Sequence, residues 1–460
     1  MQRLWAKQAL TADGWKENIC IEINDDGRIG AVAACEPGTR SQPADATETG
    51  VLLPAPANLH SHSFQRAMAG LTERRGPDPR DSFWTWRQLM YRFLDRLDPG
   101  HIEAIAAFVQ MEMLEAGFGC NVEFHYLHHQ PDGTPYDSLA ETGERIAAAA
   151  EISGAGLTLL PVLYRHGGCD RRPLGKGQIR FGNDPDRYAR LVEGSGAALS
   201  ALPRDARLGV APHSLRAATV DDLYAASRLV PDGPIHMHFV EQTAEVAEIE
   251  AAFGARPVPY LLDNLAIDER WCLIHCTQLR PRETRALARA GVVAGLCPIT
   301  ESSLGDGIFD GVRWLEEGGA FGVGSDSDIR ISLAEELRTL EYSQRLRDHS
   351  RAMLATPERS TGRRLFEDAA IGGARAAGRG TGRIETGQWA DLLALDTGHV
   401  DLEGRDGDSL LDTFVFTGDN RMIGDVWSAG RHMVKKGRHV RREAIEQRYR
   451  SCMRDLAGSL

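Results

Sequence analysis

Two histidines that could bind one metal ion follow an apolar run near the start of the chain. The segment LLPAPANLHSH, residues 52–62, ends with His60 and His62. Because a strand projects side chains i and i+2 to the same side, both imidazoles can reach one point just beyond the strand end. Neutral imidazole is the usual zinc ligand, but two ligands do not close a site. The pair predicts a metal centre only if other segments supply further ligands.

Side chains of the ligand and proton-carrying types also lie at the ends of later apolar runs. His238 falls in GPIHMHF, with Glu241 three residues further on. His275 falls in WCLIHC, and Asp326 closes AFGVGSD. The three-residue spacing between His238 and Glu241 allows the Glu241 carboxylate to lie next to a metal ion that His238 binds.

The four expected metal ligands are three imidazoles and one carboxylate: His60, His62, His238 and Asp326. This N3O set leaves a position for water, as a catalytic zinc site requires, although iron, manganese or nickel could occupy it. Glu123, in NVEFHYLHH, is a competing ligand candidate. We interpret it instead as a residue that packs against the site or supports the ligands.

Residues at separate strand ends can meet only if the strands are neighbours in one sheet. From residue 52 to about 375, short apolar runs alternate with helical patterns such as 244–254 and 282–291. Six of the later runs are residues 156–164, 207–213, 233–239, 271–276, 291–298 and 320–326. Something near eight strand–helix units favours a closed (β/α)8 TIM-like barrel, an α/β fold with its site at the carboxyl ends of the strands.

The two ends of the chain have a different, β-rich pattern. NICIEIN and RIGAVAA alternate apolar and polar residues around an Asp-Asp-Gly turn, and β character returns after residue 380. We expect a small β-sandwich domain built from both ends, with the barrel inserted between its halves. The expected boundaries are residues 1–51 and 376–440 for the β domain, 52–375 for the barrel and 441–460 for a C-terminal helix.

Charge and cysteine content argue against several classes of partner and compartment. The 460 residues carry a formal net charge of -12, which argues against nucleic acid and anionic lipid as partners. No apolar run reaches membrane-spanning length and the first residues do not resemble an export signal, so we expect a cytoplasmic protein without a membrane partner. Eight cysteines without a CxxC pair predict free, mostly buried thiols in a reducing compartment.

Taken together, these segments resemble the amidohydrolase superfamily, in its mononuclear deaminase branch. The resemblance covers nearly the whole chain, through PAPANLHSH, HFVEQ, IHC, CPITESSLGDGIFD, GVGSDSDI and GRIETGQWADLLALD. Within that branch, SFWTWRQLMYR, APHSLRA, ITESSLGDGIFDG and EELRTLEYSQRL are most similar to the formimidoylglutamate deiminase family of histidine degradation. The resemblance also implies a homodimer.

The resemblance implies a hydrolysis that releases ammonia. Binuclear relatives use a carboxylated lysine on a barrel strand, and none of the five lysines here lies in a barrel strand candidate. We therefore expect one Zn2+ per subunit, unless Glu123 bridges a second metal. The metal lowers the pKa of bound water to about 7, which supplies hydroxide to attack a C=N carbon. We assign proton removal to Asp326, proton delivery to the leaving nitrogen to Glu241, and stabilisation of the water and intermediate to His275.

The implied substrate, N-formimidoyl-L-glutamate, carries two carboxylates, which arginine binds in bidentate fashion. Arg216 in PHSLRA and Arg87 in FWTWRQ match the family's substrate-binding segments. Gln65, Tyr126 and His213 are the supporting candidates. The Gly- and Arg-rich loop at residues 166–188 is a candidate lid.

Three alternatives keep the same fold. An aminohydrolase acting on guanine or on S-adenosylhomocysteine or adenosine would need a flat apolar slot instead of arginines. A hydrolase that releases formamide would cut the same compound at a different bond. A non-catalytic relative would be free to lose Glu241, His275 and Asp326, all of which this chain retains.

Overall fold

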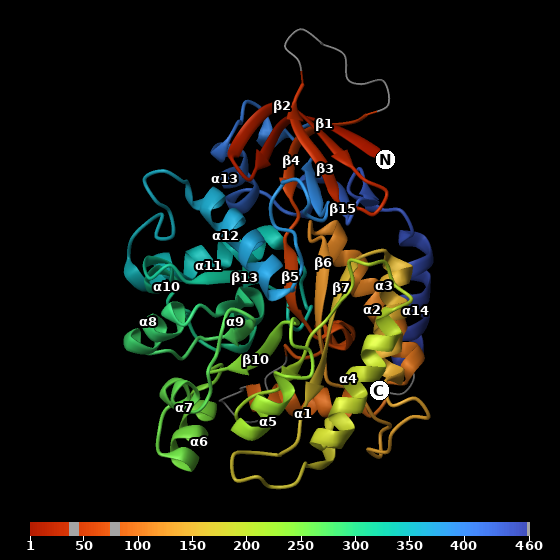
Figure 1. Ribbon diagram of the computed structural model, residues 1–460, viewed down its shortest axis with the longest axis vertical. Coiled ribbons are helices and arrows are strands. Elements are labelled where there is room, and N and C mark those ends of the chain that lie inside the picture. The colour runs from red at the N-terminus through yellow and green to blue at the C-terminus, as the bar shows by residue number, and fades with distance from the viewer. Residues whose placement is uncertain (36–45, 74–82, 458–460) are drawn as a thin grey trace.

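The computed structural model describes residues 1–35, 46–73 and 83–457. It contains a parallel barrel and, above it in Figure 1, a sheet formed by both ends of the chain. Residues 36–45 of the predicted β domain and 458–460 of the predicted C-terminal helix lie outside the described residues. Among the helices that the structure describes, none is long and apolar enough to cross a membrane.

The barrel strands occupy eight positions within the described ranges, with β8 and β9 sharing one of them. They are β5 (Ala57–Ser61), β6 (Cys120–His125), β7 (Gly156–Leu163), β8 (Arg207–Leu208), β9 (Ala211–Pro212), β10 (Ile235–Phe239), β11 (Trp271–His275), β12 (Val293–Leu296) and β13 (Ala320–Val323). Neighbouring strands pair in parallel, and bridges Val210–Ile235 and Ser61–Asp326 join the two open runs. The predicted (β/α)8 barrel is therefore confirmed.

Helices fill the connections between these strands and cover the outside of the barrel (Figure 1). They are η1 (Ser63–Met68), α1 (Phe83–Leu94), α2 (Pro99–Glu115), α3 (Glu141–Ser153), η2 (Lys176–Phe181), α4 (Pro185–Leu199), α5 (Val220–Ala226), α6 (Thr243–Phe253), α7 (Pro257–Asn264), α8 (Pro281–Arg289), α9 (Pro298–Leu304), α10 (Gly311–Glu316), α11 (Leu333–Asp348) and α12 (Thr361–Ala376). Local sequence sets their ends: the Asp98 side chain accepts the His101 amide and Pro99 starts α2.

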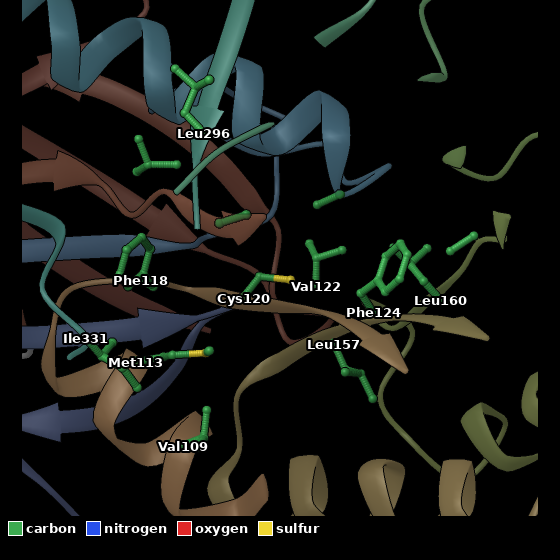
Figure 2. Packing of buried hydrophobic residues seen from close by; sticks show 14 of the residues in the cluster. Val109, Met113, Phe118, Cys120, Val122, Phe124, Leu157, Leu160, Leu296 and Ile331 are labelled. Atoms are coloured by element: carbon green, nitrogen blue, oxygen red, sulfur yellow. The ribbon is translucent and has the colours of Figure 1, made fainter. Parts of the chain in front are cut away.

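The apolar core continues from the strands into the surrounding helices. Figure 2 shows Cys120, Val122 and Phe124 spaced along β6, with Val109 and Met113 reaching toward the sheet from α2. All five side chains are buried. All six residues of β6 are buried, and its sequence CNVEFH alternates its apolar side chains with the polar side chains of Asn121, Glu123 and His125 on the other face.

The second sheet is made from both ends of the chain. Its strands are β1 (Gln2–Thr11), β2 (Gly14–Ile23), β3 (Ile29–Ala34), β4 (Thr47–Pro54), β14 (Leu392–Leu395), β15 (Ile423–Ser428), β16 (Arg431–Lys435) and β17 (Arg438–His439). The order β17-β16-β15-β14-β4-β1-β2-β3 places β4 against β14, where the two ends meet. This confirms a sheet domain built from both ends, whereas the exact domain boundaries stay a prediction.

Four further helical segments complete the C-terminal part: η3 (Val400–Leu402), α13 (Asp408–Phe416), η4 (Asn420–Met422) and α14 (Arg442–Ala457). Helix α14 packs on α2, where the rings of Tyr449 and Phe108 stack with centroids 4.0 Å apart. Figure 1 shows α14 along the flank of the barrel beside α2 and α3. The last helix of the chain thus covers a barrel helix.

Buried charges join the sheet domain to the barrel. Arg379 donates to both carboxylate oxygens of Asp391 at 3.0–3.3 Å and to the Asp205 carboxylate at 3.1 Å. Arg431, on β16, also binds Asp205, with both contacts at 2.8 Å. Because Asp205 precedes barrel strand β8, this network ties the two units, and removing one buried partner would leave an uncompensated charge.

The expectation of free thiols is wrong for two cysteines. Cys20 and Cys35 form a disulfide, with their Cα atoms 5.9 Å apart. The physical reason is strand pairing: β2 and β3 are antiparallel, and the Cys35 amide donates to Asn18 O at 2.8 Å. The other six cysteines are free and buried, as expected.

The segment at residues 166–188 is more ordered than the predicted loop. It contains η2 and the start of α4. Within it, the buried Arg180 donates to the carbonyls of His129 at 2.7 Å and Leu97 at 3.0 Å. These contacts anchor the segment to the barrel mouth, and its role as a lid stays a prediction.

Replacement of Gly324 by alanine tests the close approach that completes the barrel. An added Cβ would lie 2.6 Å from His60 N and 2.7 Å from His60 O, which are backbone atoms that cannot move aside cheaply. We expect G324A to lower the free energy of unfolding by about 1–3 kcal/mol. Chemical denaturation measures the change.

The matched control is G398A, at an exposed position where the nearest atom to the new Cβ is a side-chain oxygen 3.2 Å away. Its unfolding free energy should stay within about 0.5 kcal/mol of the parent. Equal stability of the two variants would contradict the tight approach between Gly324 and His60.

Candidate active site and metal centre

Three imidazoles and one carboxylate converge at the carboxyl end of the barrel. His60 Nε2 lies 3.2 Å from His238 Nε2, and His62 Nε2 lies 3.3 Å from the same atom. Asp326 Oδ1 lies 3.5 Å from His60 Nε2 and 3.3 Å from His62 Nε2. The structure thus brings together all four residues predicted as ligands, and their ligand atoms all lie within 4.8 Å of one another.

These distances fit a small cation at the centre of the cluster. Ligand atoms about 2.1 Å from a tetrahedral zinc ion are about 3.4 Å from one another. Burial lowers the pKa of His60 to about 3 and also lowers the pKa of His62 and His238, so the imidazoles are neutral. Neutral nitrogens that face each other cannot all be satisfied by their own protons, whereas a divalent metal would accept every lone pair.

Backbone pairing between the first and last barrel strands sets the positions of three ligands. The Asp326 amide donates to His60 O and the His62 amide donates to Asp326 O, both at 2.9 Å. The His62 ring is oriented from the other side, because its Nδ1 lies 3.0 Å from Phe124 O and its Nε2 therefore faces the cluster.

The strand ends turn sharply where the reactive side chains project. His275 has φ 74°, Cys276 has φ 54° and Asp326 has φ 51°. Left-handed backbone at residues other than glycine costs about 1–3 kcal/mol and persists only where the surroundings impose it. Here the turns at β11 and after β13 direct His275 and Asp326 into the barrel mouth.

The predicted proton-transfer residues lie beside the metal cluster. His275 Nε2 is 3.9 Å from Glu241 Oε1 and 3.8 Å from Asp326 Oδ2. Burial raises the pKa of Glu241 to about 7, so near neutral pH this carboxyl can both hold and release a proton. Burial opposes charge on His275, but Glu241 and the neighbouring carboxylates raise its pKa to about 10.

Glu123 is not part of the four-residue metal group. Its carboxylate accepts hydrogen bonds from the Ser63 amide at 2.9 Å, the Asn121 amide group at 3.0 Å and the Ser61 hydroxyl at 3.2 Å. Since Ser61 and Ser63 flank His62, Glu123 holds the ligand-bearing segment. This placement agrees with the interpretation of Glu123 as a supporting residue.

A pocket lined by His62, His238 and Asp326 opens directly onto the metal cluster. The five residues predicted to bind substrate all line it: Gln65, Arg87, Tyr126, His213 and Arg216. Gln65 Nε2 donates to Tyr126 Oη at 2.9 Å, which links two of them. Burial lowers the pKa of His213, so this imidazole is neutral beside the arginines.

Sequence reasoning missed the aromatic side chains of the pocket. They are Trp86, Tyr91, Tyr164 and Phe181. Tyr164 Oη accepts hydrogen bonds from Arg87 at 2.8 Å and from Gln178 at 2.9 Å, so it connects α1 with η2. Its position directly after the apolar run of β7 was one available signal. Trp86 and Tyr91 lie in the family-like segment SFWTWRQLMYR, whereas Phe181 carried no signal.

Comparison with known proteins agrees with this fold and site. The amidohydrolase family matches residues 51–433. A second family, described as formimidoylglutamate deiminase HutF, N-terminal domain, matches residues 1–49. A parallel barrel with an N3O cluster at its mouth and a sheet domain from both chain ends fits the first match, and the chain belongs to the amidohydrolase family.

Within that family, the chain is similar to a deiminase and, at lower identity, to deaminases. A formimidoylglutamate deiminase of Pseudomonas aeruginosa is 45% identical over 445 residues, which cover 96% of this chain and 97% of that protein. A 5-methylthioadenosine/S-adenosylhomocysteine deaminase of Natronomonas pharaonis is 26% identical over 81% of this chain and 78% of that protein.

Solved structures support the same architecture. An amidohydrolase from Brucella melitensis has a TM-score of 0.93 and 46% identity, covering 99% of this chain and 100% of that one. An adenosine deaminase from Xanthomonas campestris, solved with bound zinc, has a TM-score of 0.82 at 19% identity, covering 99% and 98% of the two chains. The second likeness is one of fold alone.

Replacement of His238 by asparagine tests the metal centre. Even the loss of a hydrogen bond to a ligand commonly weakens metal binding by about 10–100-fold, and the loss of a ligand should exceed that. We expect dialysed H238N to contain little metal when measured by plasma mass spectrometry. The control is H236N, since His236 lies on the same strand but its Nε2 bonds Ala376 O at 2.7 Å. Equal metal in both variants would contradict the assignment.

Proposed function

We propose that this chain hydrolyses N-formimidoyl-L-glutamate to N-formyl-L-glutamate and ammonia, with one zinc ion per subunit. The observation that carries the proposal is the 45% identity to a formimidoylglutamate deiminase across almost the full length of both proteins. The pocket supports it, because two arginines line the same space as the N3O cluster. Another divalent metal, such as iron, would fit the same ligands in place of zinc.

The reaction adds water across the formimino carbon and breaks its bond to the terminal nitrogen. When bound, a divalent cation lowers the pKa of a water molecule so that hydroxide is available near neutral pH. Asp326 Oδ2, which faces His275, accepts a proton from the water. The carbon then carries both oxygen and nitrogen, and loss of the nitrogen as ammonia leaves the formyl group.

Glu241 delivers a proton to the leaving nitrogen. Its carboxyl is buried at the pocket wall, and its pKa of about 7 suits transfer in both directions near neutral pH. The Glu245 carboxylate accepts the Glu241 backbone amide at 3.0 Å, which fixes the segment that carries it. His275 Nε2 lies between the carboxylates of Glu241 and Asp326 and orients the reacting groups.

The carboxylates of the substrate are assigned to Arg87 and Arg216. Both guanidinium groups are at least nine-tenths buried, so a carboxylate bound there is shielded from water and strongly attracted. Gln65, Tyr126 and His213 complete the polar lining. The same resemblance supports a homodimer in the cytoplasm, with a small dicarboxylate as the substrate partner.

Product analysis tests the proposed reaction. Zinc-loaded protein should convert N-formimidoyl-L-glutamate into equal amounts of ammonia and N-formyl-L-glutamate. N-formimidoylglycine, which lacks the side-chain carboxylate, should react with a KM at least about tenfold higher, because one charged contact is worth about 1.5–3 kcal/mol. Formamide as product would place the cut at the other bond. Activity only on guanine or S-adenosylhomocysteine would overturn the assignment of Arg87 and Arg216.

Replacement of Glu241 by glutamine tests its role in proton transfer. We expect E241Q to bind metal as the parent does while kcat falls by about 10²–10⁴-fold. The control is E248Q, on helix α6 that begins just after Glu241, where Glu248 accepts the Cys169 amide at 3.1 Å. Unchanged kcat in E241Q would remove this residue from the mechanism.

A further inference from the structure

The orientation of the His275 ring depends on a contact outside the metal cluster. His275 is the last residue of β11, and its side chain is 1% exposed. Nε2 faces the carboxylates of Glu241 and Asp326, at 3.9 Å and 3.8 Å. Nδ1, on the opposite side of the ring, lies 3.3 Å from Glu301 Oε1. Carboxylates therefore stand at both nitrogens.

Such an arrangement fixes the ring only if one of these contacts is a hydrogen bond. Each N–H of an imidazole needs an acceptor, and the partner of each nitrogen sets how the ring is turned. The Glu241 and Asp326 carboxylates lie too far from Nε2 for a hydrogen bond. Glu301 Oε1 is within hydrogen-bond reach of Nδ1, so this is the contact that can hold the ring with Nε2 toward the reacting water.

We propose that Glu301 is a positioning residue for His275: it accepts the Nδ1–H group and thereby fixes the ring orientation that directs Nε2 toward the reacting water. The proposal rests on the proposed function for the step in which His275 takes part. It does not require Glu301 to touch the substrate, and Glu301 is absent from the pocket lining.

Glu301 is itself held in place by the start of α9. The same Oε1 atom accepts the Cys297 amide at 2.8 Å, and Asp306 N donates to Glu301 O at 3.0 Å. The side chain is buried, with 7% of it exposed. A buried oxygen fixed by a backbone amide is a stationary acceptor, which is what an orienting partner of a catalytic histidine requires.

A purely structural role for Glu301 would be helix capping. Glutamate in the first turn of a helix commonly accepts the amide of the N-cap residue. Glu301 is the fourth residue of α9, and Glu283, the third residue of α8, likewise accepts the amide of its N-cap residue, Arg280, at 2.8 Å. The carboxylate of Glu283 then binds Arg256 instead of a histidine. Glu283 is therefore a control for the loss of a carboxylate that caps the start of a helix.

A second metal ion is the other alternative. His275, Cys297 and Glu301 form a buried group whose potential ligand atoms lie within 4.8 Å of one another. In that arrangement Nδ1 would carry no proton. The number of zinc ions per chain separates this alternative from the proposal.

The test uses zinc-loaded protein and three variants: E301Q, E301M and E283M. Glutamine offers one oxygen, and the Cys297 amide holds that oxygen where Oε1 stands, so E301Q keeps the acceptor for Nδ1. We expect kcat on N-formimidoyl-L-glutamate to fall by about 100-fold in E301M and by less than about tenfold in E301Q. KM should stay within about threefold, and E283M should leave kcat within about threefold.

A spectroscopic readout separates this proposal from the proposed function. ¹⁵N NMR of histidine-labelled zinc protein, with the His275 signals assigned by their loss in H275N, should show a protonated Nδ1 in the parent and in E301Q. In E301M, where the acceptor is lost, the Nδ1–H resonance should move upfield and exchange faster with water. If the parent failed to hydrolyse N-formimidoyl-L-glutamate, the proposed function would fall while this measurement still decided the role of Glu301.

Three outcomes would overturn the proposal. One is a kcat for E301M no lower than that of E283M, which would reduce Glu301 to a helix cap. Another is an unchanged Nδ1–H signal in E301M. The third is two zinc ions per parent chain with one lost in E301M, which would make Glu301 a metal ligand.

Discussion

The closure of the barrel between its first and last strands is the constraint on which the site depends. Asp326 exchanges backbone hydrogen bonds with His60 and His62, so the hydrogen bonds that join β13 to β5 also set three of the four ligand positions. Gly324 permits this approach, because a Cβ there would overlap His60 backbone atoms. The metal centre and the fold are therefore coupled, and a bound cation would stabilise the same junction.

Around this junction, burial is the largest influence on each titratable group, and neighbouring charges add to it or oppose it. Burial lowers the pKa of His60, His62 and His238 and raises the pKa of Glu241 to about 7, where His275 opposes the rise and Glu245 adds to it. Burial would also raise the pKa of Asp326, but its contact with His60 and the other imidazoles holds that pKa below its ordinary value. Near neutral pH the Asp326 carboxyl is thus ionised while the Glu241 carboxyl is partly protonated, a difference set by position.

The pocket has polar lining residues, which other side chains hold in place, and aromatic lining residues. Tyr164 ties Arg87 of α1 to Gln178 of η2, and Glu301 holds His275 from the start of α9. Each of these contacts joins segments far apart in the chain. Because these contacts hold the guanidinium and imidazole groups before substrate binds, the side chains need not rearrange on binding, and less binding free energy is lost.

The sequence by itself determined the strand–helix alternation and the residue types at the strand ends. Apolar periodicity indicated the barrel, and His60, His62, His238 and Asp326 were readable because polar residues at the carboxyl ends of parallel strands meet at one mouth. Only the tertiary structure decided which segments touch across long separations. The disulfide between Cys20 and Cys35, the contact of Glu301 with His275 and the place of Tyr164 beside Arg87 depend on strand pairing and helix packing. Local patterns report burial and backbone conformation, whereas such contacts are fixed by the packing of the whole chain.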